Sequence, residues 1–110
     1  MKKMQIGVDL TRISSFENKK ESFIKRILSP QEFLAYQQTP KNLQTLFLAR
    51  SWAIKEAIFK ADNRHFSFAK INIYKKNNVW NFKNFKISIS HEGDYLIAFV
   101  INLKESNEKN

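Results

Sequence analysis

Acidic side chains are scarce in this sequence, so their positions are informative. Asp9 lies near the end of an alternating run from Met4 to Leu10, and Glu56 lies in the most apolar periodic segment, from Lys41 to Ala61. A carboxylate in an apolar setting needs a partner, because burying an unpaired charge is costly. Lys60 follows Glu56 by four residues and therefore shares its face of a helix.

Two interpretations fit these three residues. Two carboxylates from separate elements suit a Mg²⁺ site for a phosphate substrate, because Mg²⁺ prefers oxygen ligands and keeps several waters, and Lys60 would add a positive charge beside the phosphate. In the alternative, Asp9 caps a helix starting at Leu10 or Thr11, while Glu56 and Lys60 form an ordinary pair worth about 0.2–0.5 kcal/mol. Spacing alone favours the alternative, since helical Glu-to-Lys pairs are common.

His91 follows an alternating strand and precedes a turn predicted at residues 92–94. An imidazole titrates near neutral pH, so His91 could donate to a phosphate or act as a base, and Ser90 could add a hydroxyl. A solvated loop histidine is the simpler interpretation. No nucleophile elbow or glycine-rich phosphate loop occurs, since the only glycines are Gly7 and Gly93.

The elements that must position these residues fall into two zones. Apolar residues recur every three or four positions from Ile13 to Ala61, which predicts helices, and alternate from Phe66 onward, which predicts strands. Ser29, Pro30 and Glu32 have the pattern of a capping box with proline at the first helical position.

A long helix from Lys41 to Ala61 is the predicted spine, with Thr39 as its cap before Pro40. The last predicted strand, from Tyr95 to Leu103, is apolar on both faces and should be central in its sheet. Earlier strands are predicted at residues 4–10, 66–69, 71–74 and 86–91. The sequence thus predicts one α+β domain over residues 1–110: an antiparallel sheet with a long spine helix and shorter helices packed on it, and a polar tail from about residue 104.

Composition limits the classes of function. The 110 residues are 43% hydrophobic, enough for one modest core, and a formal net charge of +9 favours an anionic partner. Without cysteine there is no disulfide framework or thiolate metal site, which fits a reducing compartment. The longest apolar run, from Leu96 to Ile101, is too short to span a membrane, and no secretory signal pattern is present. We expect a soluble, cytoplasmic protein.

The segment from Arg64 to His91 contains cations and no acid, interleaved with aromatic residues. The aromatic residues are Phe66, Phe68, Tyr74, Trp80, Phe82 and Phe85. This pattern is typical of surfaces that bind single-stranded nucleic acid, where rings stack on bases and cations follow phosphates. Phe66 and Phe68, however, share a predicted strand face and are more simply core residues. A small basic nucleic-acid-binding module is the alternative function.

Three blocks, in order, resemble the holo-acyl-carrier-protein synthases, the small 4′-phosphopantetheinyl transferases. Residues 6–10 are similar to the family's N-terminal Ile-Gly-x-Asp-Ile block. Residues 47–61 are similar to its Phe-Leu-Ala-x-Arg-Phe-x-x-Lys-Glu-Ala-x-x-Lys-Ala helix, and residues 88–91 to its Ser-x-Ser-His hairpin. Order and spacing agree over nearly the whole chain, with residues 62–86 the weakest part.

The resemblance implies transfer of the 4′-phosphopantetheine arm of coenzyme A to a serine of apo acyl carrier protein, giving the holo carrier and 3′,5′-ADP. It implies that Asp9 and Glu56 hold Mg²⁺ against the pyrophosphate and that Lys60 acts with them, steadying the pyrophosphate or the leaving group. With the metal neutralising charge, most of the catalysis would be positioning and electrostatics. The group that deprotonates the serine is left open.

The resemblance also implies coenzyme contacts from His91, with Ser90 and Arg50, and a homotrimer with sites between neighbouring subunits and no role for nucleic acid or membrane. A basic surface suits the strongly acidic carrier protein, because complementary charge steers encounter. The chain departs from the family where residues 62–66 replace a glycine-rich turn near the coenzyme. The helix arginine lies at Arg50, one place before its usual position at Ser51.

Overall fold

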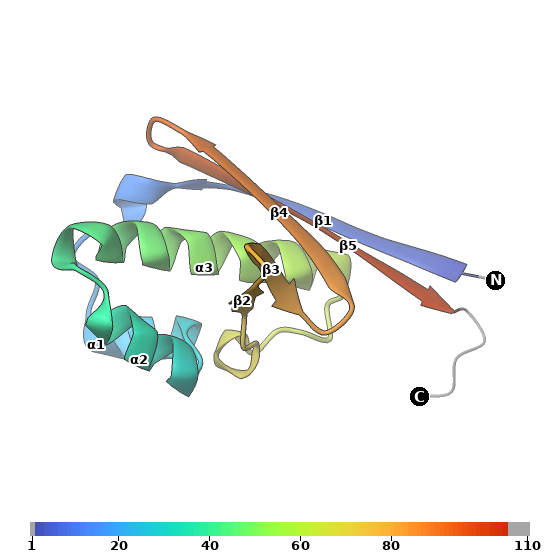
Figure 1. Ribbon diagram of the computed structural model, residues 1–110, viewed down its shortest axis with the longest axis horizontal. Coiled ribbons are helices and arrows are strands. Elements are labelled where there is room, and N and C mark those ends of the chain that lie inside the picture. Colours follow the sequence, from blue (N-terminus) through green and yellow to red (C-terminus); the bar gives the residue numbers. More distant parts are fainter. Residues whose placement is uncertain (1, 106–110) are drawn as a thin grey trace.

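The computed structural model describes residues 2–105, which form one antiparallel sheet with helices on one side of it (Figure 1). The strands are β1 (Lys2–Arg12), β2 (Tyr74–Lys76), β3 (Val79–Phe82), β4 (Phe85–Glu92) and β5 (Tyr95–Glu105), in the spatial order β1-β5-β4-β3-β2. The helices are α1 (Glu21–Ile27), α2 (Pro30–Gln38) and α3 (Lys41–Ala61), with 3₁₀ turns η1 (Ile13–Phe16) and η2 (Phe68–Lys70). The predicted α+β fold with a long spine helix is confirmed. None of the described helices is long and apolar enough to span a membrane.

β5 is central, as predicted, because it pairs with β1 on one side and with β4 on the other. Leu96, Ala98 and Val100 are buried toward α3. The opposite face of β1 and β5, here called the outer apolar face, is exposed and comprises Met4, Ile6, Val8, Leu10, Tyr95, Ile97, Phe99 and Leu103. β5 continues to Glu105, past the predicted start of the tail, and residues 106–110 lie outside the described part of the chain.

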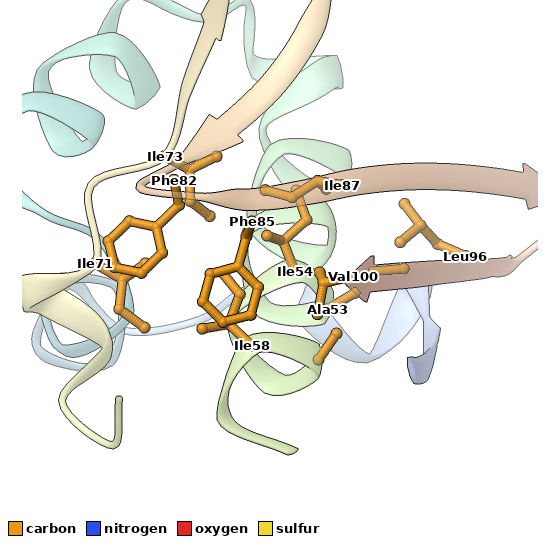
Figure 2. Close-up of a cluster of buried hydrophobic side chains, with 12 residues drawn as sticks. Ala53, Ile54, Ile58, Ile71, Ile73, Phe82, Phe85, Ile87, Leu96 and Val100 are labelled. Atoms are coloured by element: carbon orange, nitrogen blue, oxygen red, sulfur yellow. The ribbon is translucent and has the colours of Figure 1, made fainter. Parts of the chain in front are cut away.

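The spine helix α3 separates two hydrophobic clusters. On its sheet side, Ile54 and Ile58 meet Phe82, Phe85 and Val100 (Figure 2). On its other side a second cluster joins α3 to η1, α1 and the chain after it, with Phe16, Ile24, Ile27, Leu28, Leu48 and Ala49 at its centre. Alanines at the sheet side of α3 are wholly buried and let the helix approach the strands closely.

Of the two predicted helix caps, one is confirmed and one is wrong. Ser29 and Glu32 form a reciprocal capping box at the start of α2. Thr39 does not cap α3, because its hydroxyl donates instead to the carbonyl of Ala35, 2.8 Å away, at the end of α2. The N-cap position of α3 is Pro40, with no side-chain hydrogen bond, although the bounds of the helix are as predicted.

The strand predicted at residues 66–69 is wrong. Phe66 is 74% exposed and Phe68 begins η2, while Ile71 and Ile73 are buried without belonging to a strand. The backbone here bonds to helix side chains: the Phe68 carbonyl accepts from Lys55, and the Ile73 amide donates to a carboxylate of α2. These polar groups are therefore satisfied without a neighbouring strand.

The carboxylate of α2 is Glu32, and its ion pair with Lys55 lies inside the protein. The Lys55 side chain is fully buried and its Nζ atom is 2.5 Å from Glu32 Oε1, 2.7 Å from the Ile27 carbonyl and 2.9 Å from the Phe68 carbonyl. Glu32 Oε2 accepts from the Ile73 amide at 2.6 Å. Burial lowers the pKa of Lys55, and the charge of Glu32 opposes this shift. The pair joins α1, α2, α3, η2 and the chain after η2.

Replacing Lys55 by Met should lower the free energy of unfolding by about 3–5 kcal/mol, because it leaves Glu32 charged, buried and unpaired. Urea unfolding followed by circular dichroism measures the loss. The matched control is Lys25→Met, which breaks an exposed pair with Glu21 and should change stability by less than about 0.5 kcal/mol. Equal effects of the two substitutions would contradict a structural role for the buried pair.

Candidate active site

Asp9 lies on the helix-facing side of β1, and its two carboxylate oxygens have different partners. The Thr11 hydroxyl donates to Oδ2 at 2.6 Å, and Lys60 Nζ lies 3.2 Å from Oδ1 and 3.2 Å from the Val8 carbonyl. The alternative in which Asp9 caps a helix is wrong, because β1 continues to Arg12. Lys60 pairs with this carboxylate across two elements.

Gly7 is what lets β1 lie so close to α3. A Cβ atom added at Gly7 would be 1.9 Å from the carbonyl oxygen of Ala57, far inside van der Waals contact. Only a residue without a side chain fits this contact. Since Asp9 follows Gly7 by two residues on the same face, and Glu56 precedes Ala57, the backbone contact determines how near the two carboxylates lie.

Glu56 faces this part of β1 from the second half of α3. Burial raises its pKa, the charge of Asp9 raises it further, and Lys60 opposes both effects. The two carboxylates therefore repel each other across the contact between β1 and α3, and a bound cation would relieve that repulsion.

The chemistry of these donors fits Mg²⁺. Asp9 and Glu56 offer hard oxygen ligands, and within the described residues no group of three or more His, Cys, Asp or Glu gathers around a single point. Two protein carboxylates with open positions suit Mg²⁺, which keeps waters and shares phosphate oxygens, better than ions that need a full protein cage.

A cleft of about 370 Å³ opens beside Glu56 between α1, α3 and the chain before η2. It is lined by Phe23, Arg26, Ile27, Trp52, Glu56, Phe66 and Phe68. Arg26 is its basic residue, and the exposed ring of Phe66 stands at its edge. Sequence reasoning missed Phe66 by assigning it to a core strand. The missing glycines at residues 62–66 were the signal that this loop differs.

The loop at residues 62–66 is held by side chains. Arg64 donates to both carboxylate oxygens of Asp62, at 3.0 Å from Nε to Oδ1 and 2.7 Å from Nη2 to Oδ2, and this keeps the pKa of Asp62 well below its usual range. His65 packs edge-on against Phe82, with ring centroids 5.2 Å apart. A loop with side-chain hydrogen bonds and ring packing thus stands where the family pattern has a glycine-rich turn.

His91 and Ser90 are not brought to Asp9 within one chain. They line a shallow hollow of about 220 Å³ near the tip of the β4–β5 hairpin. Strand β5 lies between them and β1, since His91 is opposite Leu96 and Leu96 is opposite Thr11. The hollow also includes Leu10 and Ile97 and is continuous with the outer apolar face.

Arg50 also lies away from Asp9 and Glu56. Its guanidinium lies 5.2 Å from the ring centroid of Phe47 and 4.7 Å from that of Trp80, in a separate cleft of about 310 Å³ between α2, α3 and the β2–β3 hairpin. Burial lowers its pKa. With Trp80 under Arg50, and Phe82 and Phe85 in the core, the continuous aromatic surface required by the nucleic-acid alternative is absent from residues 64–91.

Comparison with known proteins identifies the family. Residues 5–105 match the family model described as the 4′-phosphopantetheinyl transferase superfamily. The chain belongs to this superfamily. It is 60% identical over 103 residues to the holo-[acyl-carrier-protein] synthase of Mycoplasma mobile, covering 94% of this chain and 92% of the relative. It is 55% identical over 97 residues to that of Mycoplasmopsis pulmonis, covering 88% of both chains.

Solved structures agree with the sequence matches. A holo-(acyl-carrier-protein) synthase from Bacillus anthracis, in complex with CoA (3′,5′-ADP), superposes with a TM-score of 0.78 at 26% identity, covering 93% of this chain and 96% of that one. The synthase from Neisseria meningitidis gives a TM-score of 0.77 at 26% identity, covering 88% and 95%. The predicted family and the predicted class of enzyme, a transferase, are confirmed.

The shifted pKa of Glu56 should respond to its two charged neighbours in opposite directions. In the metal-free protein, Asp9→Asn should lower the pKa of Glu56 and Lys60→Met should raise it, as followed by ¹³C NMR of the carboxyl carbon.

Because folding raises this pKa, the metal-free protein loses stability as the pH rises through the Glu56 titration. The stability of Glu56→Gln relative to the wild type should therefore be greater at pH 7 than at pH 4, as thermal unfolding of both proteins in EDTA would report. A Glu56 pKa that is the same in the wild type, Asp9→Asn and Lys60→Met would contradict the described arrangement.

Proposed function

We propose that this chain transfers the 4′-phosphopantetheine arm of coenzyme A to a serine of apo acyl carrier protein at the cluster formed by Asp9, Glu56 and Lys60. The observation that carries the site assignment is the close approach of Gly7 to Ala57, next to Glu56 in the chain, together with the 3.2 Å contact between Lys60 and Asp9. Family membership supplies the reaction, and the geometry supports where on this chain it takes place.

In the proposed reaction, the serine hydroxyl gives up its proton to a base and its oxygen bonds to the β-phosphorus of coenzyme A. The bond from that phosphorus to the oxygen of 3′,5′-ADP breaks, and the nucleotide leaves. Asp9 and Glu56 would hold Mg²⁺, which when bound neutralises charge on the pyrophosphate oxygens. Lys60, whose side chain is half exposed, can exchange its contact with Asp9 for a phosphate oxygen. Its amine would then offset charge on the pyrophosphate or on the departing nucleotide.

The cleft beside Glu56 suits the rest of both substrates. Its aromatic and aliphatic walls can bury the apolar part of the pantetheine arm, with the Phe66 ring at the edge. Arg26 lines this opening, and Lys19 Nζ lies 4.9 Å from the ring centroid of Phe23, which also lines it. An acidic carrier protein docking there would bring its serine toward Glu56, guided by complementary charge.

Transfer can be measured directly by incubating the protein with coenzyme A, Mg²⁺ and apo acyl carrier protein and weighing the carrier by mass spectrometry. Asp9→Asn and Glu56→Gln should each reduce the rate by about 100-fold or more, since each removes a proposed metal ligand. Glu17→Gln changes an exposed carboxylate outside the cluster and should transfer normally. An unmodified carrier, under conditions where a control synthase modifies it, would refute the activity; normal transfer by Asp9→Asn would refute the metal assignment alone.

We also propose a homotrimer in which each site joins the Asp9 cluster of one chain to the His91 hollow of another. Two observations support it. The outer apolar face leaves a row of large side chains exposed across β1 and β5, and such a patch favours burial against another protein. Ser90 lies at the end of that face and His91 follows it in the β4–β5 hairpin, and β5 separates both from Asp9 of the same chain. A chain without cysteine also suits the cytoplasm, which we keep as its location.

Subunit mixing tests shared sites. Asp9→Asn and His91→Ala trimers should each be nearly inactive. Co-expression of the two chains should restore transfer at about a quarter of the sites, those that take Asp9 from a His91→Ala chain and His91 from an Asp9→Asn chain. Sites built within one chain would show no such recovery.

Phe99→Lys, which puts a charge on the outer apolar face, should yield monomers by sedimentation velocity. The matched change Phe66→Lys, at an exposed ring outside that face, should leave the assembly intact.

A further inference from the structure

The Thr11 hydroxyl is directed at Asp9 and has no other hydrogen bond among the described residues. Thr11 lies two residues after Asp9 on the same face of β1, is 5% exposed, and donates to Asp9 Oδ2 at 2.6 Å. A threonine in a strand has few accessible side-chain rotamers, so this hydroxyl is held in place by its own backbone. The hydrogen bond is buried, unlike most polar contacts near the site.

The other oxygen of Asp9 is held quite differently. Oδ1 is 3.2 Å from Lys60 Nζ, at the end of a flexible side chain that is 50% exposed. A lysine ammonium can move to another anion at little cost, whereas the buried Thr11 hydroxyl would lose its acceptor. Oδ2 is therefore the fixed oxygen of the carboxylate, and Oδ1 is the oxygen that can be released to a ligand.

We propose that Thr11 is a positioning residue that retains Oδ2 and so presents Asp9 to the metal through Oδ1 alone. This inference rests on the proposed metal site and adds to it a basis for ion selectivity. Mg²⁺ requires near-octahedral geometry with single-oxygen contacts, whereas Ca²⁺ accepts carboxylates through both oxygens at longer distances. A carboxylate with one oxygen already engaged favours the smaller ion.

The packing explains why a hydroxyl-bearing β-branched residue is needed here. The methyl group of Thr11 fills space on the helix-facing side of the sheet, where its cross-strand neighbour Leu96 is buried. Valine keeps that volume and removes the donor. Serine keeps the donor and removes the methyl group, and alanine removes both.

The test measures Mn²⁺ binding to the full-length protein without coenzyme A, by the loss of the free-ion signal in electron paramagnetic resonance. Thr11→Val should weaken Mn²⁺ binding by about 10-fold, within the range seen when a hydrogen bond behind a metal ligand is lost. Displacement of Mn²⁺ by Mg²⁺ and Ca²⁺ should also show a smaller preference for Mg²⁺. Thr39→Val is the matched control, because it removes an exposed hydroxyl bonded only to the Ala35 carbonyl and should change neither quantity.

Unchanged Mn²⁺ affinity and unchanged ion preference in folded Thr11→Val would overturn the inference. If that variant does not fold, Thr11→Ser and Thr11→Ala decide the matter: serine should bind Mn²⁺ more tightly than alanine, and equal affinities would overturn it. The transfer assay separates this failure from a wider one. A wild-type protein that modifies the carrier while Thr11 variants bind metal normally refutes only the role of Thr11, whereas a wild type that binds no Mn²⁺ refutes the metal site itself.

Discussion

The buried ion pair between Lys55 and Glu32 determines how α3 is rotated in the fold. Lys55 donates to the backbone carbonyls of Ile27 and Phe68. Glu32 accepts hydrogen bonds from the amide of its own N-cap residue and from an amide of the chain beyond η2. Successive residues on a helix point about 100° apart, so once Lys55 is fixed toward α1 and α2, Glu56 is directed to the cleft between α1, α3 and the chain before η2. An interior polar contact thus orients a reactive side chain. The pair is costly to desolvate, and its many backbone partners offset that cost.

The positive charge of the chain has two separate uses in this arrangement. Lys60 compensates the carboxylates at the contact between β1 and α3, while the cations around α1 flank the cleft that an acidic carrier would approach. Arg50 serves neither, since it is stacked on aromatic rings in another cleft. The outer apolar face consists of large side chains exposed along the two longest strands, β1 and β5. A larger enzyme could cover such a face with helices of its own chain.

The sequence predicted the start of α2, the bounds of α3 and the central strand well, because hydrophobic period and the α2 capping box are local. The capping box of Ser29 and the bounds of α3 needed no knowledge of the rest of the chain. The strand predicted at residues 66–69, and the one predicted at 71–74 up to residue 73, are wrong, because the Phe68 carbonyl and the Ile73 amide bond to side chains of α3 and α2. Ile71 and Ile73 alternate with polar residues as in a strand, and both are buried, but neither belongs to a strand.

Spacing alone also failed to predict the partner of Lys60. It favoured an ordinary pair between Glu56 and Lys60, whereas Lys60 bonds to Asp9, which is 51 residues earlier. Only the resemblance to a family made the combination of Asp9 and Glu56 the leading hypothesis before the fold was known. Thr11 could not have been selected, since its significance lies in the direction of one hydroxyl.

Gly7 has a consequence for how this protein can change over generations. The sequence uses lysine, asparagine, isoleucine and phenylalanine freely and keeps two glycines. One of them, Gly93, is in an open turn at positive φ, where nothing would meet an added methyl group. The other lies against the main chain of α3, where any replacement would push the strand and the helix apart. The loop after α3 differs from the family pattern and so tolerates substitution. At Gly7 no other residue fits without separating β1 from α3.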